Sequence, residues 1–287
     1  MKILVTGKNG QLGNELQDLS QKYDFDFTFI AKEDIDLADM PRINDFIRYN
    51  GFDWIINTAA YTAVDKAEYE KEQAFMINAK AVFSMVQAAE ILGAKFIHIS
   101  TDYVFDGKKN LPYSEEDEIN PLSVYGLSKA KGEEYVLKYN FGMVIRSSWL
   151  YSNYGNNFVK TMWKLAKEKN RIKVVYDQIG TPTYAQDLAK MIMYIIECHN
   201  NKTVLFTPGL YHFSNEGVAS WYDFAQSIFE YINLKLILEP IRTEEFPRPA
   251  PRPYFSVLDK SKIKVKYDIS IPHWRESLSN MLKKKRL

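Results

Sequence analysis

The feature that most constrains this chain is the alternation of short apolar runs with longer helical patterns over its first half. The apolar runs are typical of strands and lie at 2–6, 27–31, 54–60, 95–100 and 143–148. Amphipathic segments that indicate helices fall between them, at 11–23, 40–50, 67–92 and 122–140. Strands that alternate with helices predict a parallel sheet covered on both faces. We therefore expect an α/β fold with a doubly wound parallel sheet of the Rossmann type.

The pattern changes after about residue 150. Loops rich in proline, glycine, asparagine and aromatic residues follow, and such loops on a rigid scaffold commonly carry ligand contacts. We expect 1–150 to form the Rossmann domain and 151–287 to be mostly a smaller, substrate-binding lobe. The strand pattern at 172–177 and the helical pattern at 185–198 are expected to extend the first domain, so that about 172–200 returns to it.

Composition excludes several classes of protein. With 37 Lys and Arg against 36 Asp and Glu, the chain has no broad basic surface for nucleic acid. We also expect no membrane span, because no uninterrupted apolar run approaches the necessary length. Four scattered histidines lack the spacing of a zinc site. The single cysteine, Cys198, allows no internal disulfide, which favours a reducing, cytoplasmic location.

Three glycines, Gly7, Gly10 and Gly13, stand between the first strand and the first helix. Glycines at this junction allow a tight turn and a close approach of the backbone to a phosphate, next to the free N–H groups of the helix. The spacing is G-x-x-G-x-x-G, not the G-x-G-x-x-G of the most familiar fingerprint. Its place in an alternating chain still predicts a dinucleotide, so that 1–150 is an NAD(P)-binding domain.

The end of the second strand bears on the choice between NADPH and NADH. An acidic residue there would bind a ribose 2′-hydroxyl and repel a 2′-phosphate. The stretch reads FIAKEDIDL, in which Lys32 suits a phosphate. We therefore expect NADPH, with NADH as the alternative. Asp36 and Leu37 are placed to meet the adenine end, and 59–65 lines the next part of the crevice.

The stretch YGLSK places Tyr125 and Lys129 four residues apart on a predicted helix. Thr101 ends a central strand, where ligands bind in open parallel sheets. Reduction of a carbonyl needs a hydride from nicotinamide and a proton, which a tyrosine supplies if a nearby cation lowers its pKa. The stretch YINLK, Tyr231 to Lys235, has the same spacing but no crevice strand before it, so we expect packing and surface roles there.

Together these motifs resemble the extended short-chain dehydrogenase/reductases. Finer motifs resemble the dTDP-4-dehydrorhamnose reductase family and run in order over nearly the whole chain: GKNGQLGNEL, NTAAYTAVDKAE, STDYVFDG, NPLSVYGLSKAKGE, RSSWLY, GNNFVKTM, DQIGTPT and RPYFSVLD. The resemblance implies an enzyme that uses NAD(P)H to reduce the C4 ketone of dTDP-4-dehydro-6-deoxy-L-mannose. The product would be dTDP-L-rhamnose, a precursor for cell-wall polysaccharide.

The resemblance also implies roles for single residues. Tyr125 is the expected proton donor, Lys129 its partner, and Thr101 the hydroxyl that holds the carbonyl oxygen. The expected cofactor contacts besides this pair are Gly7, Gly10, Gln11, Leu12, Gly13, Lys32, Asp36, Leu37, Ala59, Ala60, Tyr61, Thr62 and Ile99. The expected contacts with the dTDP-sugar are Thr101, Asp102, Tyr103, Val104, Trp149, Asn157 and Arg252.

Some members of this family hold Mg²⁺ at a dimer interface through several glutamates. Glu15 matches one of these glutamates, but Gln186 stands where the resemblance places another. One carboxylate cannot satisfy a cation that wants several oxygen ligands. We therefore expect no metal site, and either a monomer or a homodimer.

Two alternatives stay open at the level of sequence. The first is another nucleotide-sugar enzyme of the same fold, such as an epimerase or a reductase that gives the other C4 epimer. The second is a non-catalytic NADP-binding regulatory subunit, a role that one relative of this family has. The presence of Tyr125, Lys129 and Thr101 favours an enzyme.

Overall fold

A computed structural model describes residues 1–233 and 236–284. Its centre is a sheet of six parallel strands in the order β10-β5-β4-β3-β1-β2. The strands are β1 (Lys2–Thr6), β2 (Asp26–Ile30), β3 (Trp54–Asn57), β4 (Lys95–Thr101), β5 (Gly142–Ser147) and β10 (Gly209–His212). The chain runs from β1 to β2 on one side and from β3 through β4 to β5 on the other, so the strand order reverses between β1 and β3, as expected for a doubly wound sheet. The predicted fold class is confirmed.

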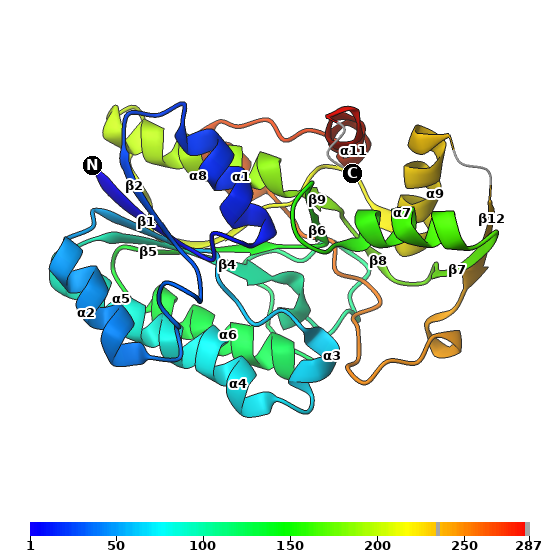
Figure 1. Ribbon diagram of the computed structural model, residues 1–287, viewed down its shortest axis with the longest axis horizontal. Helices are drawn as coiled ribbons and strands as arrows, with labels where there is room; N and C mark the ends of the chain where they lie inside the picture. Colours follow the sequence, from blue (N-terminus) through cyan, green and yellow to red (C-terminus); the bar gives the residue numbers. More distant parts are fainter. Residues whose placement is uncertain (234–235, 285–287) are drawn as a thin grey trace.

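Helices cover both faces of this sheet (Figure 1). One face carries α2 (Met40–Asn50), α5 (Ala81–Leu92) and α6 (Val124–Leu137). Between α2 and α5 the chain forms α3 (Val64–Ala67), α4 (Lys71–Phe75) and the π-helical turn η1 (Met76–Lys80). The other face carries α1 (Gln11–Ser20), α8 (Ala185–Asn200) and α10 (Ser261–Tyr267). Central strands are buried on both sides, which explains why they read as continuous apolar runs.

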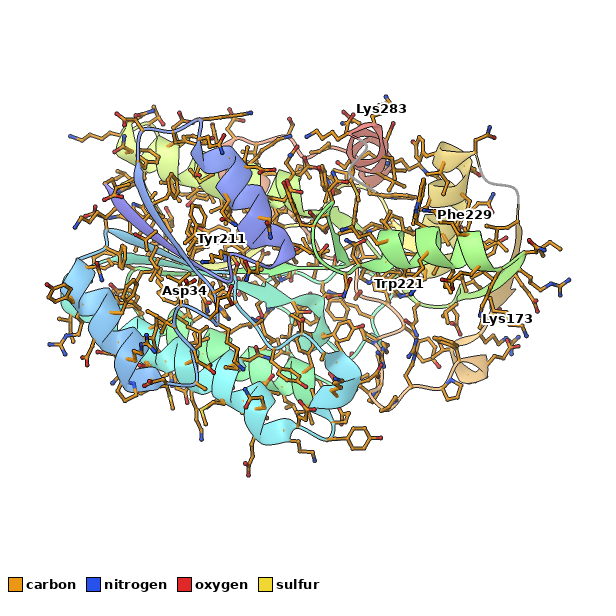
Figure 2. All side chains as sticks on the ribbon, viewed as in Figure 1. Asp34, Lys173, Tyr211, Trp221, Phe229 and Lys283 are labelled. Carbon is orange, nitrogen blue, oxygen red and sulfur yellow. The ribbon has the colours of Figure 1, made fainter. Side chains whose placement is uncertain are left out.

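A second group of elements lies beyond the carboxyl ends of the strands (Figure 1). It has its own apolar core and contains α7 (Phe158–Glu168), β7 (Arg171–Val175), α9 (Trp221–Ile232), β12 (Ile237–Ile241) and α11 (Trp274–Lys283). Short strands complete it: β6 (Leu150–Tyr151), β8 (Ile179–Gly180), β9 (Thr183–Tyr184) and β11 (Ala219–Ser220). The 3₁₀ turns are η2 (Asp102–Val104) and η3 (Thr243–Glu245). Figure 2 shows Trp221 and Phe229 in this group, away from Tyr211 and Asp34 beside the sheet.

One sequence expectation about the sheet is wrong. The strand expected at 172–177 does not extend the sheet, because β7 pairs with β12 in a separate two-stranded sheet. The reason is visible in its burial, which alternates between exposed and buried residues, as in a strand with one wet face. The sixth strand of the sheet is β10, which the sequence interpretation missed. The helix expected at 185–198 is present as α8 and packs beside α1.

One helical stretch, Lys71–Leu92, is long and apolar enough to cross a membrane by length and composition alone. Half of its most apolar window is buried inside the protein, and α5 within it packs against α2 and α6. A buried core helix passes the same test of length and composition. The stretch therefore carries no argument for a membrane span.

Candidate active site

The turn after β1 is shaped for an anion. Gly7 has a left-handed φ of 78°, which a side chain would strain. A Cβ added at Gly13 would lie 2.2 Å from the Gly7 carbonyl oxygen, so only glycine lets α1 approach the turn this closely. Gly10 begins α1, and no side chain caps its N–H groups. Uncapped amides at a helix N-terminus beside a bare turn fit the pyrophosphate of a dinucleotide.

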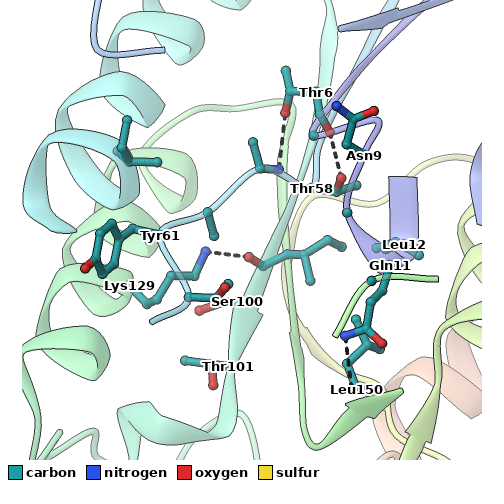
Figure 3. A pocket seen from close by; sticks show the side chains of 18 of the residues that line it. Thr6, Asn9, Gln11, Leu12, Thr58, Tyr61, Ser100, Thr101, Lys129 and Leu150 are labelled. Atoms are coloured by element: carbon teal, nitrogen blue, oxygen red, sulfur yellow. Dashed lines mark hydrogen bonds between the residues drawn. The ribbon is translucent and has the colours of Figure 1, made fainter. Parts of the chain in front are cut away.

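A pocket of about 910 Å³ opens from this turn along the carboxyl ends of the strands (Figure 3). That volume suits a large ligand with several recognition groups. Most of the predicted site residues line it: Gly7, Gly10, Gln11, Leu12, Lys32, Asp36, Leu37, Ala59, Ala60, Tyr61, Thr62, Ile99, Thr101, Asp102, Tyr103, Tyr125, Lys129 and Trp149. The structure thus brings both halves of the predicted site into one cavity.

The edge of the pocket beyond β2 holds acidic residues that are already paired. Asp34 accepts a hydrogen bond of 2.6 Å from the Lys8 ammonium, and this contact holds the pKa of Asp34 below its usual range. Glu33 accepts from the Asn9 amide at 2.5 Å. Lys32 is 76 % exposed and lies 3.6 Å from Asp36. The pairing of Asp34 reduces its repulsion of a phosphate, and the exposed Lys32 has only the longer contact with Asp36 to give up for one.

The catalytic candidates come from two adjacent elements. Thr101 ends β4, and its hydroxyl donates to Asp102 at 3.1 Å. Ser123 caps the N-terminus of α6, which places Tyr125 and Lys129 in the first turns, as predicted. Gly126 lets this helix press onto η2, since a Cβ there would lie 2.2 Å from the Tyr103 carbonyl oxygen. The close packing holds α6 against the end of β4, so that three predicted groups face one pocket.

Lys129 is almost fully buried, with 1 % of its surface exposed. Its ammonium donates to the carbonyl oxygen of Ile99 at 2.7 Å (Figure 3). It also lies 3.2 Å from Nε2 of His98. Burial lowers the pKa of Lys129 to about 8, although the charge of Glu133 opposes the shift. The lysine is therefore still mostly charged near neutral pH.

The effect of Lys129 on the tyrosine differs from the sequence expectation. Burial raises the pKa of Tyr125 to about 12, and only a hydrogen bond with Thr101 opposes this. The expected lowering by Lys129 is absent, and the ammonium contacts Ile99 and His98 instead. A raised pKa keeps the phenol protonated, which is the form that a proton donor needs before it reacts.

Asp102 is a second buried acid in this corner, 2 % exposed. Burial raises its pKa to about 6, while hydrogen bonds from Ser256 and Thr101 act in the opposite direction. Its charge also raises the pKa of Tyr125 and Tyr103. A buried carboxyl group with a raised pKa beside the candidate proton donor is typical of a functional site.

Asp102→Asn is expected to stabilise the protein at neutral pH. The folded-state pKa of Asp102 lies above its unfolded value of 3.8, so its charge weakens the fold progressively as pH rises through that value towards 6. The shift corresponds to about 2–3 kcal/mol above pH 6. Urea unfolding across this window should show a higher free energy of unfolding for the variant above pH 6 and no gain near pH 4. An equal gain at both ends of the window would contradict the assignment.

Trp149 forms part of the pocket wall. Its backbone has a left-handed φ of 46°, which is uncommon for a bulky residue. The indole stacks on Trp221 with ring centroids 3.5 Å apart, and Gly180 leaves room behind it. A Cβ at Gly180 would lie 2.6 Å from the Trp149 ring. The left-handed backbone and the stack together fix a flat aromatic face in the pocket, and its contact with substrate stays a prediction.

Four predicted residues do not line the pocket: Gly13, Val104, Asn157 and Arg252. Gly13 lies behind the turn, where its role is packing. Val104 is wrong as a wall residue, because its side chain is fully buried in the apolar cluster with Phe105 and Ala130. Asn157 caps α7, and its amide donates to Gln11 at 3.0 Å.

Arg252 also lies outside the pocket wall, because its side chain is held elsewhere. Its guanidinium binds both oxygens of Asp65, at 2.5 and 3.0 Å, and donates to the carbonyl oxygen of Ala250. This pair ties the proline-rich segment 247–253 to α3. The pair is bidentate, which is the geometry that arginine also uses with phosphates.

Several pocket residues escaped the sequence interpretation. Ser100 and Ser147 line the cavity, and the structure gives their buried hydroxyls no hydrogen-bond partner among the described residues. Trp221 also lines it, under Trp149. Ser147 could have been found, because it ends β5 directly beside Thr101 of β4, at the edge where ligands bind. Trp221 begins a helix far along the chain, and no sequence pattern links it to Trp149.

The described residues contain no group of three His, Cys, Asp or Glu that could hold a metal ion. Glu15 is buried and accepts hydrogen bonds from Ser152 and Gln186, and burial raises its pKa. Lys284 donates to Gln186 at 2.7 Å. An amide and an ammonium therefore surround this carboxylate, and this donor set does not fit Mg²⁺.

The tyrosine of the second Y-x-x-x-K stretch is not among the residues that line the pocket. Tyr231 is half-exposed on α9, and its hydroxyl donates to the carbonyl oxygen of Arg275 at 3.2 Å. This is a packing role, as expected. Lys235 lies outside the described residues.

Comparison with known proteins agrees with this geometry. The sequence profile described as "RmlD substrate binding domain" matches residues 1–287. The dTDP-4-dehydrorhamnose reductase of Sinorhizobium fredii is 40 % identical over 287 residues, covering 98 % of this chain and 97 % of that protein. The crystal structure of a dTDP-4-dehydrorhamnose reductase from Clostridium acetobutylicum is 40 % identical, with full coverage of both chains and a TM-score of 0.94.

A second solved structure, dTDP-4-dehydrorhamnose reductase from Bacillus anthracis in complex with NADP, is 38 % identical. It covers 99 % of each chain with a TM-score of 0.94. The likeness extends over the whole chain, the second group of elements included.

Proposed function

This chain belongs to the RmlD substrate binding domain family, and on that premise we propose that it is an NADPH-dependent dTDP-4-dehydrorhamnose reductase. It reduces the C4 ketone of dTDP-4-dehydro-6-deoxy-L-mannose and gives dTDP-L-rhamnose. One observation carries the proposal: Tyr125, Lys129 and Thr101 line the same cavity as the glycine turn of 7–13. The cavity therefore has room for a dinucleotide at one end and a flat aromatic wall for a sugar nucleotide at the other.

In the proposed reaction, bound NADPH supplies the hydride to the ketone carbon. The chain supplies the proton: Tyr125 gives its hydroxyl proton to the ketone oxygen as the carbon is reduced, so that an alcohol and a phenolate result. The Thr101 hydroxyl donates a hydrogen bond to the same oxygen, which requires it to leave Asp102. The Lys129 ammonium stabilises the phenolate, since opposite charge favours the ionised form.

The dTDP part of the substrate lies, in this proposal, against Trp149 and towards Arg252. Trp149 offers a ring face for a sugar or a base, and Arg252 offers a bidentate donor for the diphosphate. Because Arg252 is bound to Asp65 in the structure, a diphosphate must take over one of the two carboxylate contacts. Asn157 acts behind this wall by holding Gln11 at the turn.

NADPH is the preferred cofactor in this proposal. Asp34 is neutralised by Lys8, and Lys32 is exposed at the pocket edge with only a loose contact to Asp36. A ribose 2′-phosphate at this edge meets the exposed ammonium of Lys32, which exchanges its contact with Asp36 for one with the phosphate. NADH lacks that phosphate and gains nothing from Lys32.

Lys32→Ala is therefore expected to weaken the binding of NADPH and to leave NADH unchanged. The loss of one exposed ion pair is worth up to about 1 kcal/mol, or roughly a fivefold rise in the dissociation constant. Fluorescence titration of both cofactors measures the difference. Lys173→Ala, at an exposed lysine of β7 outside the pocket, is the matched control. Equal weakening of NADPH and NADH would contradict a phosphate contact.

The proposed activity is tested by the loss of NADPH absorbance with dTDP-4-dehydrorhamnose as substrate. Turnover that depends on both compounds is expected, and the absence of turnover with intact NADPH binding would favour a regulatory subunit. Proton NMR of the product then distinguishes the two C4 epimers, because axial and equatorial C4 protons couple differently. The rhamno product is expected, and the talo product would replace this proposal by its closest alternative.

The setting of this reaction stays a prediction. The single cysteine, Cys198, is buried as a free thiol, which suits a reducing compartment, and we propose a cytoplasmic enzyme. A monomer or a homodimer is expected, with neither nucleic acid nor membrane as partner. Analytical ultracentrifugation decides between the two oligomeric states.

A further inference from the structure

A row of buried polar side chains crosses the sheet behind the pocket. Thr6 of β1, Asn57 of β3 and His98 of β4 are direct neighbours in the strand register. The Thr6 hydroxyl lies 2.6 Å from Oδ1 of Asn57, and Nδ2 of Asn57 lies 2.9 Å from Nδ1 of His98. All three side chains are fully buried. Polar groups in such a place persist only when each has a partner, so the row must form one connected pattern.

Lys129 completes the row from the helix side. Its ammonium lies 3.2 Å from Nε2 of His98, and it also donates to the carbonyl oxygen of Ile99. Gly132 lets α6 pack closely on η1, since a Cβ there would lie 2.2 Å from the Asn78 carbonyl oxygen. The two hydrogen bonds use two of the three donors of an ammonium. The third donor is left for the pocket, which Lys129 lines.

The charge of Lys129 decides which atom donates and which accepts in each hydrogen bond of the row. An ammonium has donors only, so Nε2 of His98 must offer its lone pair, and the ring proton must sit on Nδ1. That proton then needs an acceptor, which is Oδ1 of Asn57 after a half-turn of its amide. Before the half-turn the Thr6 hydroxyl donates to Oδ1; after it Nδ2 faces Thr6, and the hydroxyl oxygen of Thr6 accepts from it. The oxygen and nitrogen ends of an amide have nearly the same shape, so this turn needs no extra space. The opposite pattern requires a neutral amine at Lys129.

The surrounding charges bear on this pair from three elements. Glu133, one turn further along α6, raises the pKa of Lys129 and is itself paired with Arg146 of β5 at 2.6 Å. Tyr125 lies one turn earlier on α6, and Asp102 of η2 bears on it. Burial and the charge of Lys129 together lower the pKa of His98 well below its usual value. The ring therefore stays neutral, and Lys129 is the group that carries the charge.

We propose that His98 is a positioning residue for Lys129: through the lone pair of Nε2 it keeps the ammonium charged and aimed at the pocket, while Asn57 and Thr6 fix the ring in its Nδ1–H form. This inference rests on the proposed function only for the catalytic role that it gives to Lys129. The row links the lysine to Thr6, which is the residue before Gly7 of the phosphate turn. Both ends of the cofactor pocket are thus tied to one hydrogen-bonded row.

The first test reads the ring directly and needs no turnover. Histidine ¹⁵N–¹H correlation NMR of the full chain near neutral pH reports which ring nitrogen carries the proton. The resonances of His98 are identified by their loss in His98→Gln. We expect a neutral Nδ1–H ring for His98. The Nε2–H ring, or a charged ring, would overturn the proposal whatever the enzyme reduces.

The second test separates positioning from packing. His98→Gln retains an acceptor for Lys129, whereas His98→Phe removes it and fills the space. Without the acceptor the charged lysine loses a hydrogen bond, so its pKa falls further by about 1 unit. The basic limb of the pH profile for NADPH binding should move down by that amount in His98→Phe. In His98→Gln the basic limb should stay close to its position in the parent chain, because Gln still accepts from Lys129.

His212→Gln is the matched control for loss of stability. His212 is also a fully buried histidine, but its ring contacts the Tyr113 carbonyl oxygen and Arg146 rather than Lys129. We expect it to lower the unfolding temperature and to leave the basic limb in place. If the basic limb of NADPH binding lies at the same pH in folded His98→Phe and folded His98→Gln, the ring only fills space, and the proposal is overturned. If His98→Phe does not fold, the NMR result on the parent chain decides alone.

Discussion

Tyr125→Phe is expected to abolish almost all turnover while NADPH still binds. The phenol is the proton donor of the proposed reaction, and the loss of a general acid reduces kcat by about 10²–10⁴-fold. The ring itself remains, and its edge contact with Tyr103, at 5.7 Å between centroids, is kept. The pocket should therefore keep its shape. Single-turnover loss of NADPH absorbance measures the chemical step, and fluorescence titration measures the cofactor affinity.

Tyr231→Phe provides a control with the same chemical change. Tyr231 has the same Y-x-x-x-K setting in sequence, but its hydroxyl donates to the Arg275 carbonyl oxygen outside the pocket. We expect it to change stability by about 1 kcal/mol, the worth of one hydrogen bond, and kcat by less than about twofold. A Tyr125→Phe enzyme with normal kcat would move the proton donor elsewhere, and Asp102 would become the first group to test. If Tyr125→Phe no longer binds NADPH, the loss of turnover reports on cofactor binding and does not support the role of Tyr125 as proton donor.

The raised pKa of Tyr125 also changes how the pair with Lys129 is understood. The sequence interpretation makes the lysine an agent that lowers the tyrosine pKa before reaction. In the structure the phenol is firmly protonated, and the ammonium is held by His98 and Ile99. The charge of Lys129 then acts as the proton leaves, when a phenolate forms in the buried corner. This is stabilisation of charge that develops during the reaction, where electrostatic groups contribute most.

The sequence predicts the sheet well because its strands obey one simple rule. The strands β1, β3 and β5 are buried on both faces, so most of their residues are apolar. The glycine turn is predictable for a similar reason, since a close approach of the backbone admits no side chain. Such features depend on neighbours in sequence or on a single steric requirement. Local patterns therefore place Gly7, Thr101 and Tyr125 correctly at the carboxyl edge.

The errors arise where the fold depends on distant partners. The run at 172–177 is apolar enough for a strand, but its partner, β12, comes some sixty residues later. The pairing of Arg252 with Asp65 of α3 could not be predicted for the same reason, although the arginine keeps the chemistry that the proposed diphosphate contact needs. The row that ends at His98 is hidden for the same reason, because each of its members stands alone in the sequence. Strand register, and no local motif, brings Thr6, Asn57 and His98 together.

A buried ion pair holds the helix that carries Tyr125 and Lys129. Arg146 of β5 binds Glu133 of α6 through Nε at 2.9 Å and through a terminal nitrogen at 2.6 Å, and both residues are at most 3 % exposed. The guanidinium also lies over the ring of Phe105. The contact is one turn beyond Lys129, on the side of α6 that faces the sheet. The pair therefore fixes the rotation of α6 on which the catalytic geometry depends.

Arg146→Met is expected to destabilise the protein by about 3–5 kcal/mol, since it leaves the carboxylate of Glu133 buried without a partner. The lost charge matters more than the lost volume, because Met fills much of the same space. The double variant Arg146→Met, Glu133→Gln should therefore regain most of the free energy of unfolding, measured by urea denaturation. Acid should also narrow the deficit of the single variant, because a protonated carboxyl is cheaper to bury than a carboxylate.

These two variants separate the ion pair's contribution to stability from its effect on the site. If the pair only adds stability, the double variant recovers both the unfolding free energy and kcat. If the pair also sets the rotation of α6, stability returns while kcat stays low, since an amide and a thioether do not make the two directional contacts of a guanidinium. We expect the second outcome. A single Arg146→Met variant as stable as the parent would show that water or another group reaches Glu133, and it would remove the pair from the argument about Tyr125 and Lys129.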